Sequence, residues 1–276
     1  MLSLHTNVAA LSAQNSVAGS QKSLATSMSR LSTGLRVNSA MDDAAGLQIA
    51  TRLNAQTRGQ AVAMRNTQNG ISMLQTAEGA LNETTNILLR MKDLATEAAS
   101  DTASAADRTA MQKELEALNS ELDNIFNNTS FGGRTLFTGA AALSSATQLQ
   151  IGASTSETMT LSGLTAVTGF SMGASTAVAV GSATTANTLI GTLQTKIDTL
   201  SSFRSELGAI ANRLDHTYNN LSNMSTNTEA ARGRIMDVDY AAETAQMTKQ
   251  QMLLQAGTSM LKQSGSMSQL VMSLMQ

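Results

Sequence analysis

The stretch LQTKIDTLSSFRSELGAIANRLDHTYNNL, residues 193–221, places a leucine at every seventh position without exception. The five leucines of this ladder are Leu193, Leu200, Leu207, Leu214 and Leu221. Alternate positions of the same heptad are also apolar, except that Arg204 interrupts them. Four heptads of this kind predict a helix, over about residues 188–226, because a strand would need period two. Its apolar stripe requires partner helices, since an isolated helix of this length cannot offset its conformational entropy.

Working outward toward the N-terminus, the sequence predicts two further long helices. Apolar residues at helical spacing predict the first over about residues 4–33, and Gly34 follows as its C-terminal cap. The second is expected over about 43–98, with Ser39 and Asp42 in capping-box spacing just before it. The region between helix and ladder is therefore also expected to be mainly helical.

The middle of the chain predicts one more helix and a β-hairpin. A second capping box, Ser104 with Asp107, starts a helix that ends at 127–128, before the turn residues Gly132 and Gly133. Alternating apolar and polar residues then predict a hairpin over about 147–162. Residues 163–187 are rich in Ala, Ser, Thr and Gly, and are expected to form a short variable loop.

The last helix is expected over about residues 238–275, so both ends of the chain are helical, poor in charge and apolar on one side. Such faces form a large sticky surface unless other subunits cover them, which favours self-assembly over a monomer core as their explanation. The residues predicted to form this coiled coil are Leu4, Val8, Leu11, Leu24, Leu31, Leu253, Met260, Met267, Val271 and Leu274. The predicted fold class is mainly α: long antiparallel helices in a coiled-coil bundle, with one small β-hairpin.

Composition excludes several classes of protein. The chain of 276 residues contains no proline, which suits uninterrupted helices, and no cysteine, which excludes disulfides and thiolate chemistry. A net charge of −2 argues against nucleic-acid binding. No run of apolar residues is long enough to span a membrane, and the N-terminus lacks the basic and apolar regions of a cleaved signal.

No catalytic or metal-binding pattern is apparent in the sequence. His5 and His216 fall in different predicted helices, and neither has a carboxylate or second histidine at ligand spacing. Asp42 and Asp43 are adjacent, so on a helix their side chains point about 100° apart, and a role at a helix start explains them better. We therefore expect no enzyme activity, no cofactor and no metal.

Four stretches resemble bacterial flagellins. They are RLSTGLRVNSAMDDAAG at 30–46, TAEGALNE at 76–83, FGGRTLF at 131–137, and the C-terminal run that starts with DYAAETAQMTKQQ at 239. The resemblance covers about residues 1–162 and 189–276. It implies a self-assembling structural subunit of the flagellar filament, exported by the flagellar type III apparatus and secreted. Residues 163–187 leave no room for the large outer domains of many flagellins.

The resemblance also implies a domain division and partners. Residues 1–40 with 240–276 would be the inner coiled-coil domain, and residues 44–228 the outer helical domain. Many copies of the chain, an export chaperone and a cap protein would be the partners, with no nucleic acid and no membrane. Arg90, Leu94 and Glu114 match the positions through which many flagellins contact a toll-like receptor of a host, although subunit packing is an alternative role for them.

Two other functions are compatible with parts of this pattern. A hook–filament junction protein shares the helical termini, but the length and the close match of the tail favour flagellin. A secreted, membrane-active translocator would also use amphipathic helices. The polar faces of these helices lack the basic residues that such a protein needs.

Overall fold

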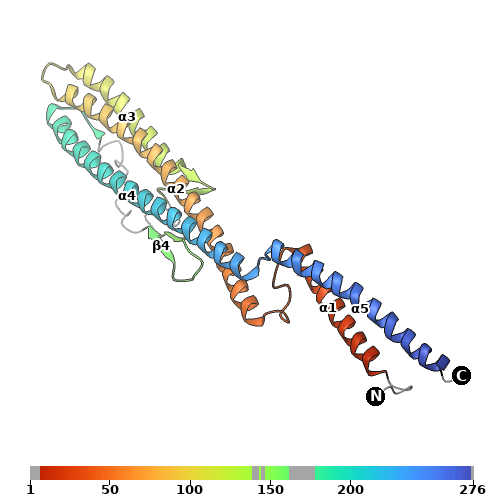
Figure 1. Ribbon diagram of the computed structural model, residues 1–276. Helices are drawn as coiled ribbons and strands as arrows, with labels where there is room; N and C mark the ends of the chain where they lie inside the picture. The colour runs from red at the N-terminus through yellow and green to blue at the C-terminus, as the bar shows by residue number, and fades with distance from the viewer. Residues whose placement is uncertain (1–6, 139–142, 144–146, 162–177, 275–276) are drawn as a thin grey trace. The chain divides into compact units, whose positions relative to one another are not determined.

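A computed structural model describes residues 7–138, 143, 147–161 and 178–274, with side chains to residue 266. Within these ranges the chain is mainly helical (Figure 1). The helices are α1 Val8–Thr33, α2 Ala44–Ala99, α3 Ala105–Asn128, α4 Ala183–Met236 and α5 Tyr240–Leu274. The strands are β1 Ser130–Phe131, β2 Arg134–Thr135, β3 Thr147–Gln150 and β4 Thr158–Leu161. The predicted fold class is confirmed.

The chain divides into two compact units. One contains residues 1–56 and 227–276, and the other contains residues 57–226. The first unit thus includes the start of α2 and the end of α4, which the sequence-based division had assigned to the outer domain. The inner and outer roles of the two parts stay a prediction.

In the unit of residues 57–226, α2 and α4 bury matching heptad positions against each other. On α4 all five leucines of the ladder are buried, at 5% exposure or less. On α2 the buried positions step by three and four residues without exception from Gln60 to Ala98. They are Gln60, Ala63, Thr67, Gly70, Leu74, Ala77, Leu81, Thr84, Leu88, Met91, Ala95 and Ala98. This repeat is the seam of an antiparallel coiled coil.

Arg204, which interrupts the ladder, has its partner on α2. Its Nε and Nη2 both donate to Oε1 of Glu78, at 2.9 and 2.7 Å. A longer contact of 3.5 Å joins Nη1 to Thr85 Oγ1. The charge in the heptad is thus compensated across the seam, and it fixes the register of α4 on α2.

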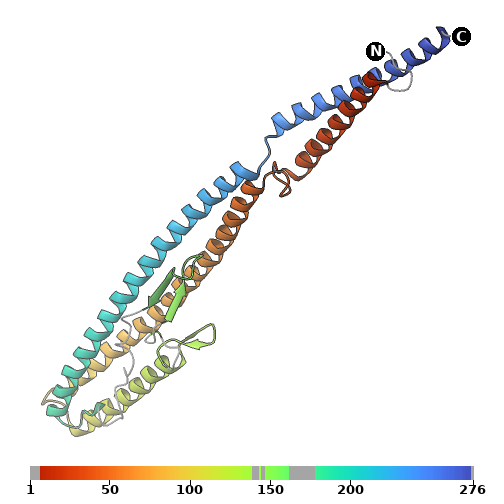
Figure 2. The ribbon, with the colours of Figure 1, turned by 90° about the horizontal axis from the view of Figure 1, so that it is seen from below.

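Helix α3 packs beside α2 and completes the core of this unit (Figure 1 and Figure 2). The predicted capping box at its start is present: Asp107 N–H donates to Ser104 Oγ, and Ser104 N–H donates to Asp107 Oδ2. Strands β1 and β2 follow as a short hairpin around Gly132 and Gly133, both at positive φ. The sequence predicted this turn but not its strands.

The second hairpin, β3–β4, confirms the prediction for residues 147–162, with Leu149 opposite Met159. It packs on α2 through two glycines of that helix. A Cβ at Gly59 would lie 2.6 Å from Ala153 Cβ, and one at Gly70 would lie 2.8 Å from Leu149 Cδ1. Glycine is needed here because any side chain would push the hairpin away from the helix.

Helix α4 is longer than predicted, running from Ala183 to Met236 rather than over 188–226. Its last carbonyl groups are satisfied by Arg36, whose backbone N–H donates to Met236 O and whose Nη2 donates to Ile235 O. Such carbonyls have no partner within the helix. A residue 199 positions away therefore stabilises the end of α4.

The predicted cap before α2 is wrong. Asp42 does receive hydrogen bonds from Ser39, but both lie in a turn that precedes the helix. Asp43 is the residue that caps α2, because its Oδ1 accepts the N–H of Gly46. At the end of α1 the prediction is confirmed, since Gly34 adopts φ 72° and donates its N–H to Arg30 O.

Candidate functional site

The two terminal helices pair along a seam of mostly small residues on α1. The seam positions step by three and four residues, as in a coiled coil. They are Ala10, Ala13, Val17, Ser20, Leu24, Ser27 and Leu31, all buried or half-buried. Only three of these side chains are large and apolar, so the helices pack closely.

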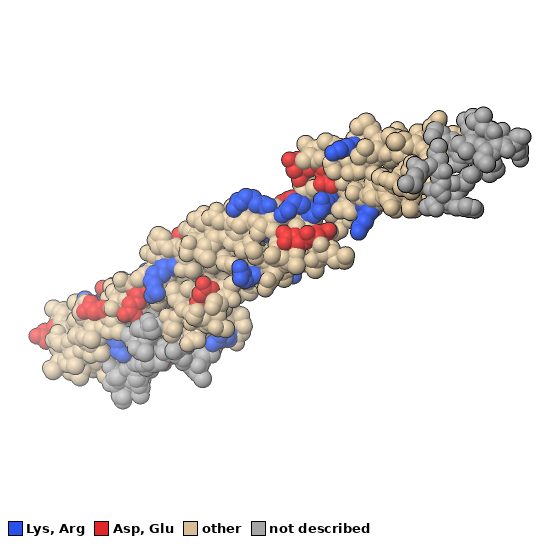
Figure 3. Space-filling view, turned by 60° about the horizontal axis from the view of Figure 1, so that its bottom comes forward, with Lys and Arg blue, Asp and Glu red and all other residues tan. Residues whose placement is uncertain are grey.

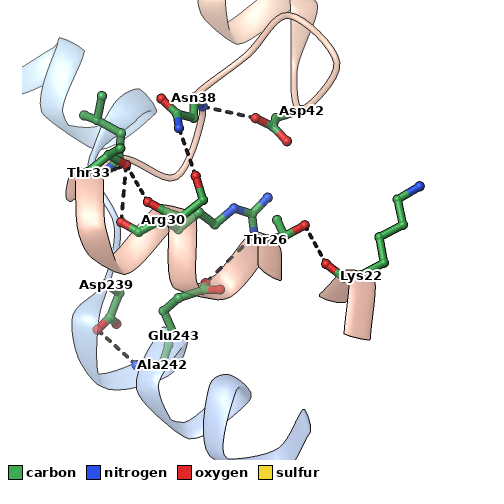
Figure 4. Close-up of polar contacts among 11 residues, drawn as sticks. Lys22, Thr26, Arg30, Thr33, Asn38, Asp42, Asp239, Ala242 and Glu243 are labelled. Atoms are coloured by element: carbon green, nitrogen blue, oxygen red, sulfur yellow. Dashed lines mark hydrogen bonds and ion pairs between the residues drawn. The ribbon is translucent and has the colours of Figure 1, made fainter. Parts of the chain in front are cut away.

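The facing seam on α5 follows the same repeat. Its half-buried positions are Glu243, Met247, Gln250, Leu254, Gly257, Leu261 and Ser264. A Cβ at Gly257 would lie 2.6 Å from Val17 Cγ2, so this glycine allows the closest approach of the two helices. The helices are antiparallel: Asn7 Nδ2 donates to Ser264 Oγ at 3.2 Å near one end of the pair. Arg30 lies 3.8 Å from Glu243 at the other end (Figure 4).

The residues predicted to form the coiled coil divide between this seam and the surface. Leu24 and Leu31 lie in the seam. Val8 and Leu11 on α1 are 69% and 54% exposed. On α5, Leu253 and Met260 each precede a seam leucine and are 47% and 66% exposed.

The remaining predicted coiled-coil residues cannot be placed in this way. Leu4 lies outside the described residues, as do the side chains of Met267, Val271 and Leu274. Among the described residues, Met28 and Met252 add two more exposed apolar side chains to the pair. Figure 3 shows that the visible surface of these helices is mostly uncharged. Their role in assembly stays a prediction.

A short antiparallel bridge ties the two segments that connect the terminal helices to α2 and α4. Leu35 pairs with Asp237, and Val238 N–H donates to Gly34 O at 3.0 Å. Asp239 then starts α5 by accepting the N–H groups of Ala241 and Ala242 (Figure 4). Asp237 and Asp239 are therefore used by the backbone around α5, whereas the sequence suggested an ion-pair cluster with Arg232 and Arg234.

Asp42 orders the turn between α1 and α2. Its Oδ2 accepts the N–H groups of Asn38 and Ser39 and the hydroxyl of Ser39 (Figure 4 shows the first). The backbone hydrogen bond from Ser39, followed by that from Asn38, lowers the pKa of this carboxyl below its ordinary value of 3.8. The carboxylate form thus holds the turn together.

This arrangement predicts a pH-dependent contribution to stability. Because the pKa of Asp42 is lower in the folded chain than in the unfolded one, the contribution is complete above pH 3.8 and is lost as pH falls through the folded-state pKa. We expect Asp42→Asn to lower the melting temperature at pH 6, and the difference from the unsubstituted chain to shrink below pH 3.8. Thermal unfolding of both chains across this pH range measures it; a constant difference would contradict the role of the carboxylate.

The predicted receptor residues lie near the far end of α2 and α3. Arg90 donates to Glu114 Oε1 through Nε at 3.0 Å and Nη2 at 2.7 Å. The hydrogen bond from Arg90 to Glu114 raises the pKa of Arg90 above its ordinary value. Leu94, by contrast, is only 3% exposed and belongs to the core. Any contact with a receptor would therefore rest on Arg90 and Glu114.

Among the described residues, no three His, Asp or Glu side chains are placed to hold a metal ion. His216 lies with Arg213 and Thr217 of α4 beside β4, and His5 is outside the described range. No described helix is long and apolar enough to cross a lipid bilayer. The feature that calls for a function is the unmatched apolar surface of α1 and α5.

Comparison with known proteins gives matches over nearly the whole chain. Residues 4–142 match the bacterial flagellin N-terminal helical region, and residues 190–275 match the bacterial flagellin C-terminal helical region. Flagellin A of Vibrio anguillarum is 35% identical over an alignment that covers 100% of both chains. Polar flagellin F of Vibrio parahaemolyticus is 35% identical, with 99% of each chain covered. Both alignments extend over more than 276 positions, so these relatives contain segments that this chain lacks.

Solved structures agree with this result. The crystal structure of Bacillus cereus flagellin is 36% identical, with a TM-score of 0.50 over 61% of this chain and 94% of that one. A flagellar hook-associated protein of Vibrio parahaemolyticus reaches a TM-score of 0.61 over 71% of this chain and all of that one. Its sequence is only 16% identical, so this second likeness shows the fold alone.

Proposed function

Because this chain belongs to the bacterial flagellin family, we propose that its paired terminal helices, α1 and α5, are the element through which each copy joins its neighbours. As a flagellin, the chain is a structural subunit of the flagellar filament, an extracellular polymer of many copies used for motility. Identity to flagellins over the full length favours this role over that of a hook–filament junction protein.

One observation supports the proposal most strongly: the apolar residues of α1 and α5 exceed what their mutual seam uses. The seam contains small residues such as Ala13 and Gly257, whereas Val8, Leu11 and Met260 remain exposed. An exposed set of this kind on both helices is typical of a surface that another chain covers. In a helical polymer, neighbouring copies of the same pair are the partners at hand.

We expect the double substitution Leu253→Gln and Met260→Gln to raise the critical concentration for polymerisation at least about tenfold. Burying each of these side chains contributes roughly 1.5–3 kcal/mol, and 1.4 kcal/mol corresponds to a factor of ten. Sedimentation of polymerised protein over a concentration series measures the effect. Because both residues are exposed in the single chain, helix content should stay unchanged.

Ser259→Gln is the matched control, since Ser259 is an exposed polar residue beside Met260. It should polymerise like the unsubstituted chain. If the double variant also did so, the exposed residues of α5 would not be assembly contacts.

The same proposal extends to the division of the chain and its partners. Residues 1–40 with 240–276 would form the inner part of the filament, and residues 44–228 the part around it. An export chaperone and a cap protein would shield the exposed apolar set until a neighbouring copy covers it, and export would use the flagellar type III apparatus. A toll-like receptor of a host would meet Arg90 and Glu114, whose ion pair is exposed. No catalysis is part of this proposal.

A further inference from the structure

Helix α2 has a line of residues without apolar side chains at one heptad position, away from its buried seam. The line consists of Arg58, Arg65, Ser72, Gly79, Asn86 and Asp93. All are exposed except Ser72, which is half-exposed. Because the seam repeats every seven residues from Gln60 to Ala98, residues at one heptad position follow a single line along the helix.

The charge changes sign along this line. Between residues 44 and 77, α2 carries three arginines and no acidic residue. Between residues 78 and 128, in α2 and α3, there are ten acidic and four basic residues. We define the basic end of the line as Arg58 and Arg65, and the acidic end as Asp93 with Glu97, one helical turn further on.

Neither end has its charges compensated by an ion pair in the described part of the chain. Arg58, Arg65, Asp93 and Glu97 are all exposed, and none lies within 4.0 Å of an opposite charge. Nearby charges of the same helix do find partners, as Glu78 does in Arg204. The two ends are thus available to charges on another molecule.

We propose that the basic end on one copy of the chain binds the acidic end on a second copy, head to tail. Arg58 and Asp93 are 35 residues apart. At 1.5 Å per residue, a copy displaced by about 50 Å along α2 therefore brings its acidic end level with the basic end of the first copy. Two different complementary patches on one molecule form a heterologous contact, which propagates as an open polymer.

This contact rests on the filament role proposed above and adds to it. The apolar surface of α1 and α5 supplies burial without direction, whereas complementary charges at a fixed separation along α2 set the axial register. Opposite ends attract, and equal ends of two copies repel, so a copy shifted or reversed is disfavoured. The contact is solvent-exposed, and therefore weakens as sodium chloride is raised from about 0.05 to 0.3 M, because the Debye length falls below about 10 Å.

The test uses two full-length variants, Arg58→Glu with Arg65→Glu and Asp93→Lys with Glu97→Lys. The first has acidic residues at both ends of the line, and the second has basic residues at both ends. Each alone is expected to show a critical concentration raised about tenfold or more. A 1:1 mixture is expected to recover to within about threefold of the unsubstituted chain, because alternating copies restore every contact.

Arg213→Glu, a reversal of an exposed arginine on α4, is the matched control and should change the critical concentration by less than about twofold. Circular dichroism confirms that all variants keep their helix content. If either double variant polymerised alone like the unsubstituted chain, or if the folded variants failed to copolymerise, the head-to-tail charge contact would be refuted. The contribution of α1 and α5 would stand, since it is tested by Leu253 and Met260.

Discussion

Replacing Gly257 by leucine is expected to disrupt the pairing of α1 with α5 and to abolish filament assembly. A Cβ at this position would lie 2.6 Å from Val17 Cγ2, well inside the contact distance of about 3.5–4.0 Å between carbon atoms. Relief requires the helices to move apart along the seam, because Val17 is buried and has no space to turn. Overpacking of this kind costs roughly 1–3 kcal/mol even in larger cores. The narrow seam between α1 and α5 has few other contacts to offset it.

Gly265→Leu is the control, because no atom lies within 4 Å of a Cβ at Gly265. Leucine is the better helix former by about 0.5–1 kcal/mol, so both substitutions should favour the isolated helix. Only the effect on packing differs. Assembly is measured by sedimentation and electron microscopy, and the helix pair by circular dichroism.

A size swap gives a second control. Gly257→Ala alone should weaken assembly, and adding Val17→Ala should restore part of it because the space is returned. Equal behaviour of Gly257→Leu and Gly265→Leu would show that the close approach at Gly257 is not required.

Replacing Phe203 by alanine is expected to lower the free energy of unfolding of the unit formed by residues 57–226 by about 3–5 kcal/mol. Phe203 is 1% exposed and is among the largest fully buried side chains of the chain. Its removal leaves a cavity in the core that α2, α3 and α4 share. For a unit of this size, the melting temperature should fall by roughly 10 °C.

Leu89→Ala provides the comparison, since Leu89 is on α2 but 46% exposed. Its loss should cost about 1 kcal/mol or less. Calorimetric unfolding of the two variants separates the effects. Similar melting temperatures would mean that Phe203 does not pack in a core of this kind.

Regular repeats made much of the fold predictable. The ladder leucines of α4 are buried as expected, because a strict seven-residue period leaves one possible face for the helix to bury. The capping box of Ser104 with Asp107 was equally legible, since both members lie within three residues of each other. Local patterns of this kind determine local structure.

Features that depend on distant residues were not predictable. The polar sequence after Leu221 suggested that α4 stops near 226, but Arg36 stabilises its end at Met236. Ser39 and Asp42 have the spacing of a helix cap, yet the chain uses Asp43 instead. In both cases the deciding contact cannot be read from a short window of sequence.

The terminal helices illustrate the same limit at the candidate site. The spacing of Leu253 and Met260 predicts a coiled-coil stripe, whereas the intramolecular seam of α5 runs one residue further on, through Leu254 and Leu261. Hydrophobicity alone does not distinguish a face that packs within one chain from a face that packs between chains. Small residues such as Gly257 and Ala13 identify the intramolecular seam, because they allow helices to approach closely.

The rate at which hydrogen peroxide oxidises Met260 in the monomer and in the filament tests the central claim most directly. Peroxide transfers one oxygen to the exposed thioether, giving methionine sulfoxide and water, and the rate follows exposure of the sulfur. Met260 is 66% exposed in the single chain, and Met91, fully buried, serves as the internal reference. If neighbouring copies cover the apolar surface of α1 and α5, peptide mass spectrometry will show Met260 oxidised rapidly in the monomer and protected in the filament. Equal oxidation of Met260 in both states would contradict the account.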